Sequence, residues 1–290
     1  DEQVAVALAQ ADHGAGYVAL SGGAVAGVLL VRHEVLTPED EAFTWARPAV
    51  AQVGVSGWHV DPAADLVAVL AVLVEQASAD ALAHGIHHLT GWVRAADWEG
   101  ASAWAALGFR PETVLAGRVL GERAVPSPRV RVAAEADRAA LVALATEEIL
   151  PHAEHTSAGT SADQDPLTVE RTVDQALAAM ADGRHVSLVA ELDGAVVGSL
   201  AASVLDVSDT SPARGWLPAQ HLYIGLTSVT AGVRGRGFGA DLVEAALAWA
   251  TDQGLGCAML HYVVENDLAG RLGTRQGFVP VITGWTRTTG

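Results

Sequence analysis

The residues with the clearest chemical potential lie in VTAGVRGRGFGADLV, from Val229 to Val243. This stretch places Gly235, Gly237 and Gly239, with two interleaved arginines, between a run of strand-forming residues and a run of helix-forming ones. A glycine-rich loop that opens a helix presents unpaired backbone N–H groups and the positive end of the helix dipole. Phosphate is the usual occupant, and arginine adds a charge-assisted contact. The stretch therefore predicts a phosphate-binding loop, with a glycine-rich turn and solvent-facing arginines as the simpler alternative.

Two familiar phosphate loops fit this stretch poorly. A Walker loop requires a lysine followed by serine or threonine after its last glycine, but Gly239 is followed by Ala240. The dinucleotide fingerprint GxGxxA matches at Gly235, Gly237 and Ala240. However, it requires an acidic residue about 20 positions further on, at a strand end. The strand expected over 257–264 carries no acid, so a dinucleotide site is disfavoured.

A third phosphate loop fits better. RGRGFG, Arg234 to Gly239, begins five residues after Val229 and resembles the Arg/Gln-x-x-Gly-x-Gly/Ala pyrophosphate loop of the GNAT superfamily of acyl-coenzyme A dependent N-acyltransferases. A second motif, NxxA at 266–269 followed by Leu272 and by GF at 277–278, is similar to the segment after the family's fifth strand. The resemblance covers about 130–287 and implies direct attack of an amine on the thioester of acetyl-coenzyme A, without a metal.

The resemblance also implies which residues hold the coenzyme. The end of the strand that precedes the loop would pair with the pantetheine arm as an added strand does. The loop amides and arginines would bind the pyrophosphate. The residues assigned to acetyl-coenzyme A in this way are Thr227, Ser228, Val229, Arg234, Gly235, Arg236, Gly237, Phe238, Gly239, Ala240, Asn266 and Ala269.

The groups that would move protons are less well defined. An amine with a pKa of about 10.4 is mostly protonated at neutral pH, so a base or a water chain must remove its proton. The strand HLYIGLTSV is expected to turn His221, Tyr223 and Thr227 to one face, with Leu222 and Leu226 on the other. We therefore assign Tyr223 and His221 as the candidate catalytic residues.

Two positions depart from the pattern of the family. Tyr223 stands where many relatives carry a glutamate base, and Gly273 stands where they frequently carry a tyrosine acid. Three interpretations follow: Tyr223 or His221 acts with ordered water, a residue of a substrate loop acts, or the chain binds coenzyme without turnover. The predicted function is transfer of an acetyl group to a primary amine of a small molecule or peptide. An acyl-coenzyme A binding protein without turnover, a pseudoenzyme or sensor, is the alternative.

The chain contains two related segments. GGAVAG at 22–27 and DGAVVG at 193–198 both predict hairpin turns, and their glycines are 171 positions apart (194 − 23 = 171). GFRP at 108–111 and GFVP at 277–280 are 169 apart (277 − 108 = 169). We therefore expect an α/β protein of two tandem domains, 1–121 and 130–290, each a mixed central β-sheet flanked by helices, with a linker over 122–129. The first copy has too few residues before its hairpin for the opening strand and helix.

Periodicity in the second copy predicts the order βααβββαβαβ. Its strands are expected over 130–133, 185–191, 195–205, 222–229, 257–264 and 278–286. Its helices are expected over 137–149, 167–180, 237–253 and 268–275, and Asp137 is the expected N-cap of the first.

The first copy lacks the glycines of the loop. An offset of 169 places four residues of the first copy opposite Arg234, Gly235, Gly237 and Gly239 of the second, and these four are Asp65, Leu66, Ala68 and Leu70. An aspartate repels pyrophosphate, and side chains close its approach. The first copy is therefore predicted to bind no coenzyme, an architecture similar to that of mycothiol synthase-like enzymes.

Composition narrows the classes of partner. The 290 residues include 17 Lys and Arg against 34 Asp and Glu, which gives a formal net charge of −17. This charge disfavours nucleic acid and anionic membranes as partners and permits a cationic substrate. A single cysteine and the lack of a basic-then-apolar leader favour a cytoplasmic protein. We expect a monomer or a homodimer.

Three further groups carry weaker signals. His84, His87 and His88 have a spacing that could suit a metal, but they are interpreted as solvent-facing, because no acidic or cysteine ligand is obvious nearby. HAEH at 152–155 follows the first helix of the second copy, in a connection that would cover the acceptor site. Five tryptophans of the first copy are interpreted as packing residues: Trp45, Trp58, Trp92, Trp98 and Trp104.

Overall fold

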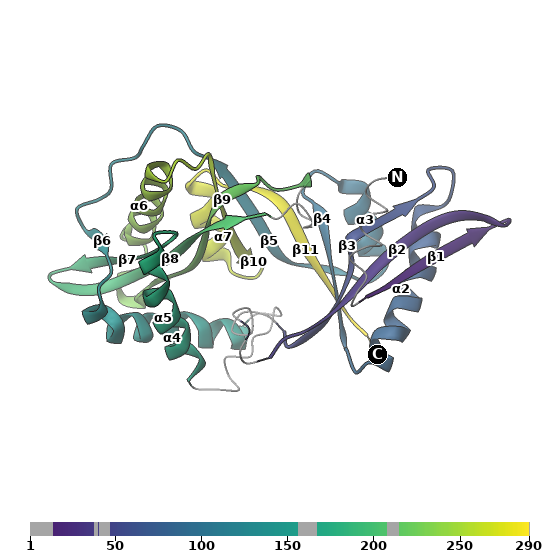
Figure 1. Cartoon of the computed structure of the whole chain (residues 1–290), viewed down its shortest axis with the longest axis horizontal. Helices are drawn as coiled ribbons and strands as arrows, with labels where there is room; N and C mark the ends of the chain where they lie inside the picture. Colours follow the sequence, from purple (N-terminus) through teal and green to yellow (C-terminus); the bar gives the residue numbers. More distant parts are fainter. Residues whose placement is uncertain (1–13, 38–39, 41–46, 156–166, 208–214, 290) are drawn as a thin grey trace.

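The computed structural model describes residues 14–37, 40, 47–155, 167–207 and 215–289, with the backbone alone at 55–56 and 150–155. The described strands form one mixed sheet in the order β1-β2-β3-β4-β11-β5-β10-β9-β8-β7-β6 (Figure 1). These strands are β1 Gly14–Ser21, β2 Ala24–Val35, β3 Ala49–Val60, β4 His88–Arg94, β5 Arg110–Val119, β6 Val130–Val132, β7 His185–Leu192, β8 Ala195–Asp206, β9 Gln220–Val229, β10 Cys257–Val263 and β11 Val279–Thr288. The described α-helices are α2 Leu66–Ala83, α3 Trp98–Ala106, α4 Arg138–His155, α5 Thr168–Ala179, α6 Phe238–Asp252 and α7 Asp267–Arg275.

The predicted α/β class is confirmed, and a large mixed sheet flanked by helices is consistent with two domains. Every element predicted between 130 and 290 is present, although α4 runs to His155 instead of ending at residue 149. Asp137 ends a short 3-10 turn before α4, where its carboxylate accepts a hydrogen bond from the Ala134 N–H at 2.8 Å and pairs with Arg131. It therefore caps that turn and is not the N-cap of α4.

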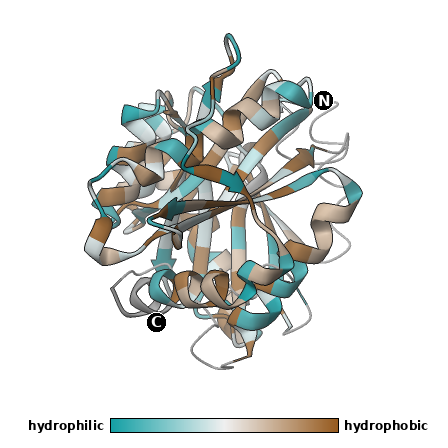
Figure 2. Cartoon of the chain, turned by 90° about the vertical axis from the view of Figure 1, so that its left-hand side faces the viewer, coloured by the Kyte–Doolittle hydropathy of each residue, from teal (hydrophilic) through white to brown (hydrophobic). Residues whose placement is uncertain are grey.

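Helices cover the two faces of the sheet unevenly. The helices α2 and α6 pack on one face, because the buried residues of both helices contact strand residues that lie side by side in the ladder. The helices α4 and α5 pack on the opposite face, over β7 to β9. Viewed from the end that carries β6 and β7, helices lie on both sides of the strands (Figure 2). No described helix of the first half covers the face that carries α4 and α5 in the second.

The two halves of the chain exchange their last strands. The strand β5, last in the first half, pairs with β10 of the second half from Cys257↔Val119 to Val263↔Thr113. The strand β11, last in the second half, lies between β4 and β5 and pairs with both (Figure 1). Each half of the sheet is thus completed by a strand from the other half. The predicted boundaries, 1–121 and 130–290, follow the repeat in the sequence and stay a prediction.

Equivalent local features recur in the two halves. The hairpins β1–β2 and β7–β8 both turn through two residues with positive φ, Gly22–Gly23 and Asp193–Gly194. The register shifts after Ala19 in the first hairpin and after Ala190 in the second (190 − 19 = 171). This geometry follows the offset found in the sequence.

The helix α2 is long and apolar enough to cross a membrane, judged by length and composition alone. In the structure it packs on the sheet of the first half, and its buried residues are Leu70, Leu73, Val74, Ala77, Ser78 and Ala81. The apolar residues of α2 are thus explained by the packing of one of its faces in the core.

A buried ion pair fixes the end of β5 near the junction of the halves. The Arg47 guanidinium donates two hydrogen bonds to the Glu112 carboxylate, at 2.7 and 2.9 Å. Glu112 is 7% exposed, and burial raises its pKa even though Arg47 opposes the shift. Replacing Arg47 by alanine should lower the free energy of unfolding by about 3 kcal/mol, because it leaves a buried carboxylate without its cation.

The loss in Arg47→Ala should shrink as pH falls. Without Arg47 the pKa of Glu112 rises further, so protonation favours the folded state at lower pH. Urea unfolding at pH 7 and pH 5 measures this, with Arg47→Ala/Glu112→Gln as the control that removes the charge. Arg47 would act by packing alone if Arg47→Ala lost the same free energy of unfolding at both pH values and Arg47→Ala/Glu112→Gln lost that amount too.

Candidate functional site

The glycine-rich loop leaves the start of α6 without a side-chain cap. Gly235 and Gly237 have φ of +79° and +92°, a region that side chains rarely adopt. Gly237 is the N-cap residue of α6 and has no side chain to occupy the first amides. The segment from Gly235 to Gly237 is exposed. The amides at the positive end of α6 are therefore open to an anion.

The equivalent helix start in the first half is closed. The Asp65 carboxylate caps α2 by accepting a hydrogen bond from the Ala68 N–H at 3.0 Å. The residues 61–65 separate β3 from α2, whereas the longer segment 230–237 separates β9 from α6. Asp65 thus stands opposite Gly237, the other N-cap, and the predicted pairing of Asp65 with Arg234 is wrong at this point. The longer loop of the second half explains the difference.

Three arginines lie around the start of α6. The Arg234 side chain turns back, and its Nε donates to the Val229 carbonyl oxygen at 2.8 Å, so it closes the loop onto the end of β9. The Arg236 guanidinium lies 5.9 Å from the centre of the Phe238 ring. Arg129, which the sequence analysis missed, lies 4.4 Å from the same ring and forms an ion pair with Asp241. Nothing in the sequence near Arg129 signals this position, because it lies just before β6 and is far along the chain from the loop.

Several residues assigned to the coenzyme hold the frame of the site. The Phe238 side chain is 1% exposed in the core under α6, so only its backbone faces the loop. A Cβ on Gly239 would lie 3.4 Å from Leu272, which shows how closely α6 approaches α7. The Asn266 side chain caps α7 by accepting a hydrogen bond from the Ala269 N–H at 3.1 Å. Ala240 lies in the first turn of α6.

A β-bulge changes the two faces of β9. Gly225 and Leu226 lie opposite the single residue Ala201, because the register shifts between Ile224 and Thr227. After the shift, Leu226 packs with α4 and α5, and Thr227 pairs beside the α6 core. The prediction that Tyr223 and Thr227 share one face is therefore wrong. A bulge leaves a residue outside the ladder and re-aims its neighbours, and sequence alternation cannot reveal it.

Two predicted site residues of β9 have buried side chains. Ser228 is 1% exposed, and its Oγ donates to the Leu144 carbonyl oxygen at 2.9 Å, which ties β9 to α4. His221 is 3% exposed, with Nδ1 3.3 Å from the Pro218 carbonyl oxygen, and burial lowers its pKa. The structure thus places the imidazole of His221 in the packing at the start of β9.

Tyr223 forms a pair with a histidine that the sequence analysis missed. The Tyr223 Oη lies 3.1 Å from His261 Nδ1, and the rings meet edge to face with centroids 5.7 Å apart. The strands β9 and β10 are parallel, and Tyr223 is the register partner of Met259, two residues before His261. The register therefore puts both side chains on one face, a signal available only once the pairing of β9 with β10 is known.

The environment of His261 keeps its ring neutral. The side chain reaches solvent, but it lies at the middle of the sheet, and the surrounding protein desolvates it and lowers its pKa to about 4. A neutral imidazole has one acceptor nitrogen, so Nδ1 can accept the hydrogen bond of the Tyr223 hydroxyl. In the tautomer that carries its proton on Nε2, the pair presents a phenolic oxygen whose proton points toward the histidine.

Trp104 lies beside the parallel strands β3 and β4 of the first half, and the equivalent position of the second half is a glycine. The strands β3 and β4 pair at Ala51↔Leu89 and Gln52↔Thr90, and then separate. The Trp104 side chain, fully buried, lies against the gap, 3.5 Å from where a Cβ would stand on Gly54 or on Gly91. An offset of 169 puts Gly273 of α7 opposite Trp104 of α3. At this position α7 therefore carries no indole, and Gly273 is buried beside Leu260 and Phe278.

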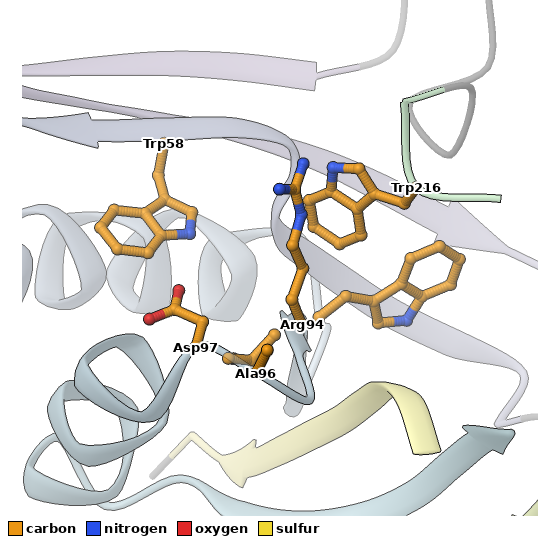
Figure 3. Close-up of a pocket in the computed structure, with 7 residues that line it drawn as sticks. Trp58, Arg94, Ala96, Asp97 and Trp216 are labelled. Carbon is orange, nitrogen blue, oxygen red and sulfur yellow. The ribbon is translucent and has the colours of Figure 1, made fainter. Parts of the chain in front are cut away.

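A cavity of about 410 Å³ lies where the halves meet. It is lined by Trp58, Trp92, Val93, Arg94, Ala96, Asp97 and Trp216. Arg94 stacks on Trp216, 5.0 Å from the ring centre, and Asp97 lies nearer to Trp58 (Figure 3). Trp92 and Trp216 also pack in one cluster with Tyr223, so the cavity and the Tyr223–His261 pair border the same hydrophobic cluster, although neither member of the pair lines the cavity.

The outcome for the other tryptophans is mixed. Trp104 is a core residue as predicted. Trp58 and Trp92 pack against core clusters, also as predicted, and in addition line the cavity. Trp98 is 72% exposed, so the packing prediction is wrong for it. Trp45 lies outside the described residues. HAEH at 152–155, predicted in a connection, forms the last turn of α4, because the helix runs on to His155, and its side chains lie outside the described ones.

Comparison with known proteins agrees with this architecture. Residues 151–278 match the model of the Acetyltransferase (GNAT) family. No curated protein matches the chain. A GCN5-related N-acetyltransferase from Sphaerobacter thermophilus is similar in structure, with a TM-score of 0.56 at 16% identity, over 94% of this chain and 80% of that one.

Two further solved structures show the same fold. An acetyltransferase of the GNAT family from Colwellia psychrerythraea gives a TM-score of 0.53 at 12% identity, over 95% of this chain and 85% of that one. A tandem GNAT protein from the clavulanic acid biosynthesis pathway, without AcCoA, gives 0.50 at 19% identity, over 98% and 88%. At these identities the likeness shows the fold.

Proposed function

We propose that this chain, whose residues 151–278 belong to the GNAT acetyltransferase family, transfers an acetyl group from acetyl-coenzyme A to a primary amine of a small molecule or peptide. The observation that carries the proposal is the open start of α6. Its N-cap is Gly237, the amides are free of a side-chain cap, and Arg129 and Arg236 flank them. This arrangement suits a pyrophosphate.

The coenzyme would run from this loop into the gap between β9 and β10. The pyrophosphate binds the loop amides, and the pantetheine arm pairs with the end of β9, at Thr227 to Val229. The first half offers no second site, because Asp65 caps α2 and Trp104 fills the equivalent gap. We therefore propose a tandem protein that binds one coenzyme per chain. Its first half is a degenerate copy that has lost the coenzyme site.

The amine would attack from the face that carries Tyr223 and His261. A C–N bond forms, and the nitrogen becomes cationic as the tetrahedral intermediate appears. Its proton passes through the Tyr223 hydroxyl and the neutral His261 ring to water, and the C–S bond breaks to release coenzyme A as the thiolate. Thiols have a reference pKa of about 8.5, so the thiolate leaves without the tyrosine acid that Gly273 replaces.

The cavity between the halves would receive the body of the acceptor. Its indole faces attract an ammonium group or an apolar ring. The Asp97 carboxylate, which also accepts a hydrogen bond from the Gly100 N–H, adds negative charge, and the Arg94 guanidinium over Trp216 adds a positive charge to the same lining. A cationic acceptor would also suit the net charge of −17 of the chain. The acceptor is therefore expected to be a cationic amine with an apolar or ring-shaped part.

Trp216→Ala should raise the KM for the acceptor about fivefold, since one aromatic contact contributes about 1 kcal/mol. The acetyl-coenzyme A affinity should stay unchanged, because the cavity lies away from α6. Steady-state kinetics with the acceptor varied measures this, and Trp98→Ala, which removes a 72% exposed indole, is the matched control. An equal effect of both substitutions would remove the cavity from the acceptor path.

The function is tested by release of free thiol from acetyl-coenzyme A in the presence of a mixed library of amines. The proposal predicts release that depends on the amine. Coenzyme binding without any acceptor-dependent release would contradict it and would favour a binding protein without turnover.

A further inference from the structure

Three side chains of types that bind metals converge in the first half, between β2 and α2, on the face of the sheet that α2 covers. His33 comes from β2, and Asp80 and His84 lie one turn apart on α2. The His33 Nε2 lies 3.5 Å from Asp80 Oδ2, and the rings of His33 and His84 have centroids 4.8 Å apart. One ligand atom from each of the three residues lies within 4.8 Å of the others.

The polar atoms of this cluster are not satisfied by one another. Within the described part of the chain, His33 Nε2 and the hydroxyl of the adjacent Tyr17 are buried without a hydrogen-bond partner. A separation of 3.5 Å between His33 and Asp80 is too long for a good hydrogen bond. Buried polar groups without partners are rare, and here they surround one point.

We propose that His33, Asp80 and His84 bind a Zn²⁺ ion, with water in the fourth position. Tetrahedral Zn²⁺ with bonds of about 2.0–2.2 Å separates its ligand atoms by roughly 3.4 Å, so the present spacing needs only a small closure. His84 can supply it, because its side chain is 59% exposed and only its Nδ1 is held, by the Asp80 carbonyl oxygen. Two imidazoles and one carboxylate favour Zn²⁺ over Mg²⁺ or Ca²⁺, which prefer oxygen ligands.

The local geometry favours this ligand set in a second way. Asp80 and His84 are four residues apart on one face of α2, a spacing that places two ligands side by side. The His84 Nδ1 lies 2.8 Å from the Asp80 carbonyl oxygen. Such a contact directs the remaining ring nitrogen toward a metal. The sequence analysis predicted no metal here, because it grouped His84 with His87 and His88 instead of with His33.

The ion would join β2 to α2 in the half that binds no coenzyme. The site is built from residues on the α2 face of the sheet, whereas the Tyr223–His261 pair lies on the opposite face. Its role is therefore to stabilise the first half and not to take part in acyl transfer. Binding of Zn²⁺ to the folded chain should raise the unfolding temperature in proportion to the logarithm of the Zn²⁺ concentration.

Titration of the metal-free full chain with Zn²⁺ against a chromophoric chelator tests the proposal. We expect one tight equivalent that Mg²⁺ does not displace, lost at least tenfold in affinity in His84→Ala and in His33→Gln. His87→Ala is the matched control and should bind as the parent chain does. His84→Ala keeps the test decisive if His33→Gln fails to fold, since the His84 side chain is mostly exposed. Absence of a tight equivalent, or one unchanged in His84→Ala, would overturn the proposal.

Discussion

Gly237→Val should abolish acetyl-coenzyme A binding. Gly237 has a φ of +92° as the N-cap residue of α6, and a β-branched residue does not adopt this conformation without strain. Valine would either distort the loop or turn the first amides of α6 away from the pyrophosphate. Its side chain would also project toward Arg129, whose Nη2 lies 3.6 Å from the position of a Cβ on Gly237. Isothermal titration calorimetry measures the loss.

Ala68→Val is a control that places the same side chain near the start of the equivalent helix in the first half. Ala68 lies in the first turn of α2, where Asp65 already caps the helix. Coenzyme binding should be as in the parent chain. Gly237→Ala, a smaller change at the same φ, should weaken binding less than valine does. Unimpaired binding in Gly237→Val, with an unchanged melting temperature, would mean that the loop does not hold the pyrophosphate.

Tyr223→Phe should lower the turnover number by about 10² or more, the size typical of a lost proton-transfer group. The phenolic oxygen is the only part removed, so packing of the ring in the cluster with Met259 and Leu115 is kept. Coenzyme affinity should be nearly unchanged, because the pyrophosphate loop is untouched. Turnover at the level of the parent chain would reduce Tyr223 to a packing residue.

His261→Asn tests the second member of the pair. Because the pKa of His261 is lowered to about 4, the ring is already neutral throughout the range of pH 6 to 9. The rate in the parent chain should therefore rise with pH only as the acceptor amine loses its own proton. We expect His261→Asn to lower the turnover number without changing the pH at which the rate rises. An acidic limb near pH 6.5 that disappears in His261→Asn would show that the histidine titrates with an ordinary pKa.

Local features of the fold were predictable because they depend on neighbouring residues. The glycines of the two hairpins and of the loop before α6 adopt the positive φ that their sequence indicates. Helices and strands of the second half follow hydrophobic periodicity, which their burial on one face requires. Asp97 is the N-cap of α3, and Asn266 is the N-cap of α7. The two residues occupy equivalent positions in the repeat.

Features that depend on distant contacts were not predictable. The strands β5 and β11 each pair with strands of the other half, and the residue pattern along each strand would be the same if they paired within their own half. The bulge at Gly225 and Leu226 inserts one residue, and alternation along β9 gives no sign of it. Arg129 and His261 reach the site through the register of the sheet.

Strand exchange also links the halves in function. The cavity takes Trp92 and Arg94 from β4 and Trp216 from the segment before β9, so both halves build its walls. The strand β11 pairs with β4 beside these residues. The first half, which we propose binds no coenzyme, is thus expected to shape the proposed acceptor site.

The stoichiometry of acetyl-coenzyme A is the most direct test of the central claim, that one of two related halves holds the coenzyme. Titration calorimetry on the full chain should give one site per chain. The reason is that α6 begins with an uncapped glycine, whereas α2 begins with an aspartate that occupies its own amide. Two equivalent sites per chain, or none, would contradict the account.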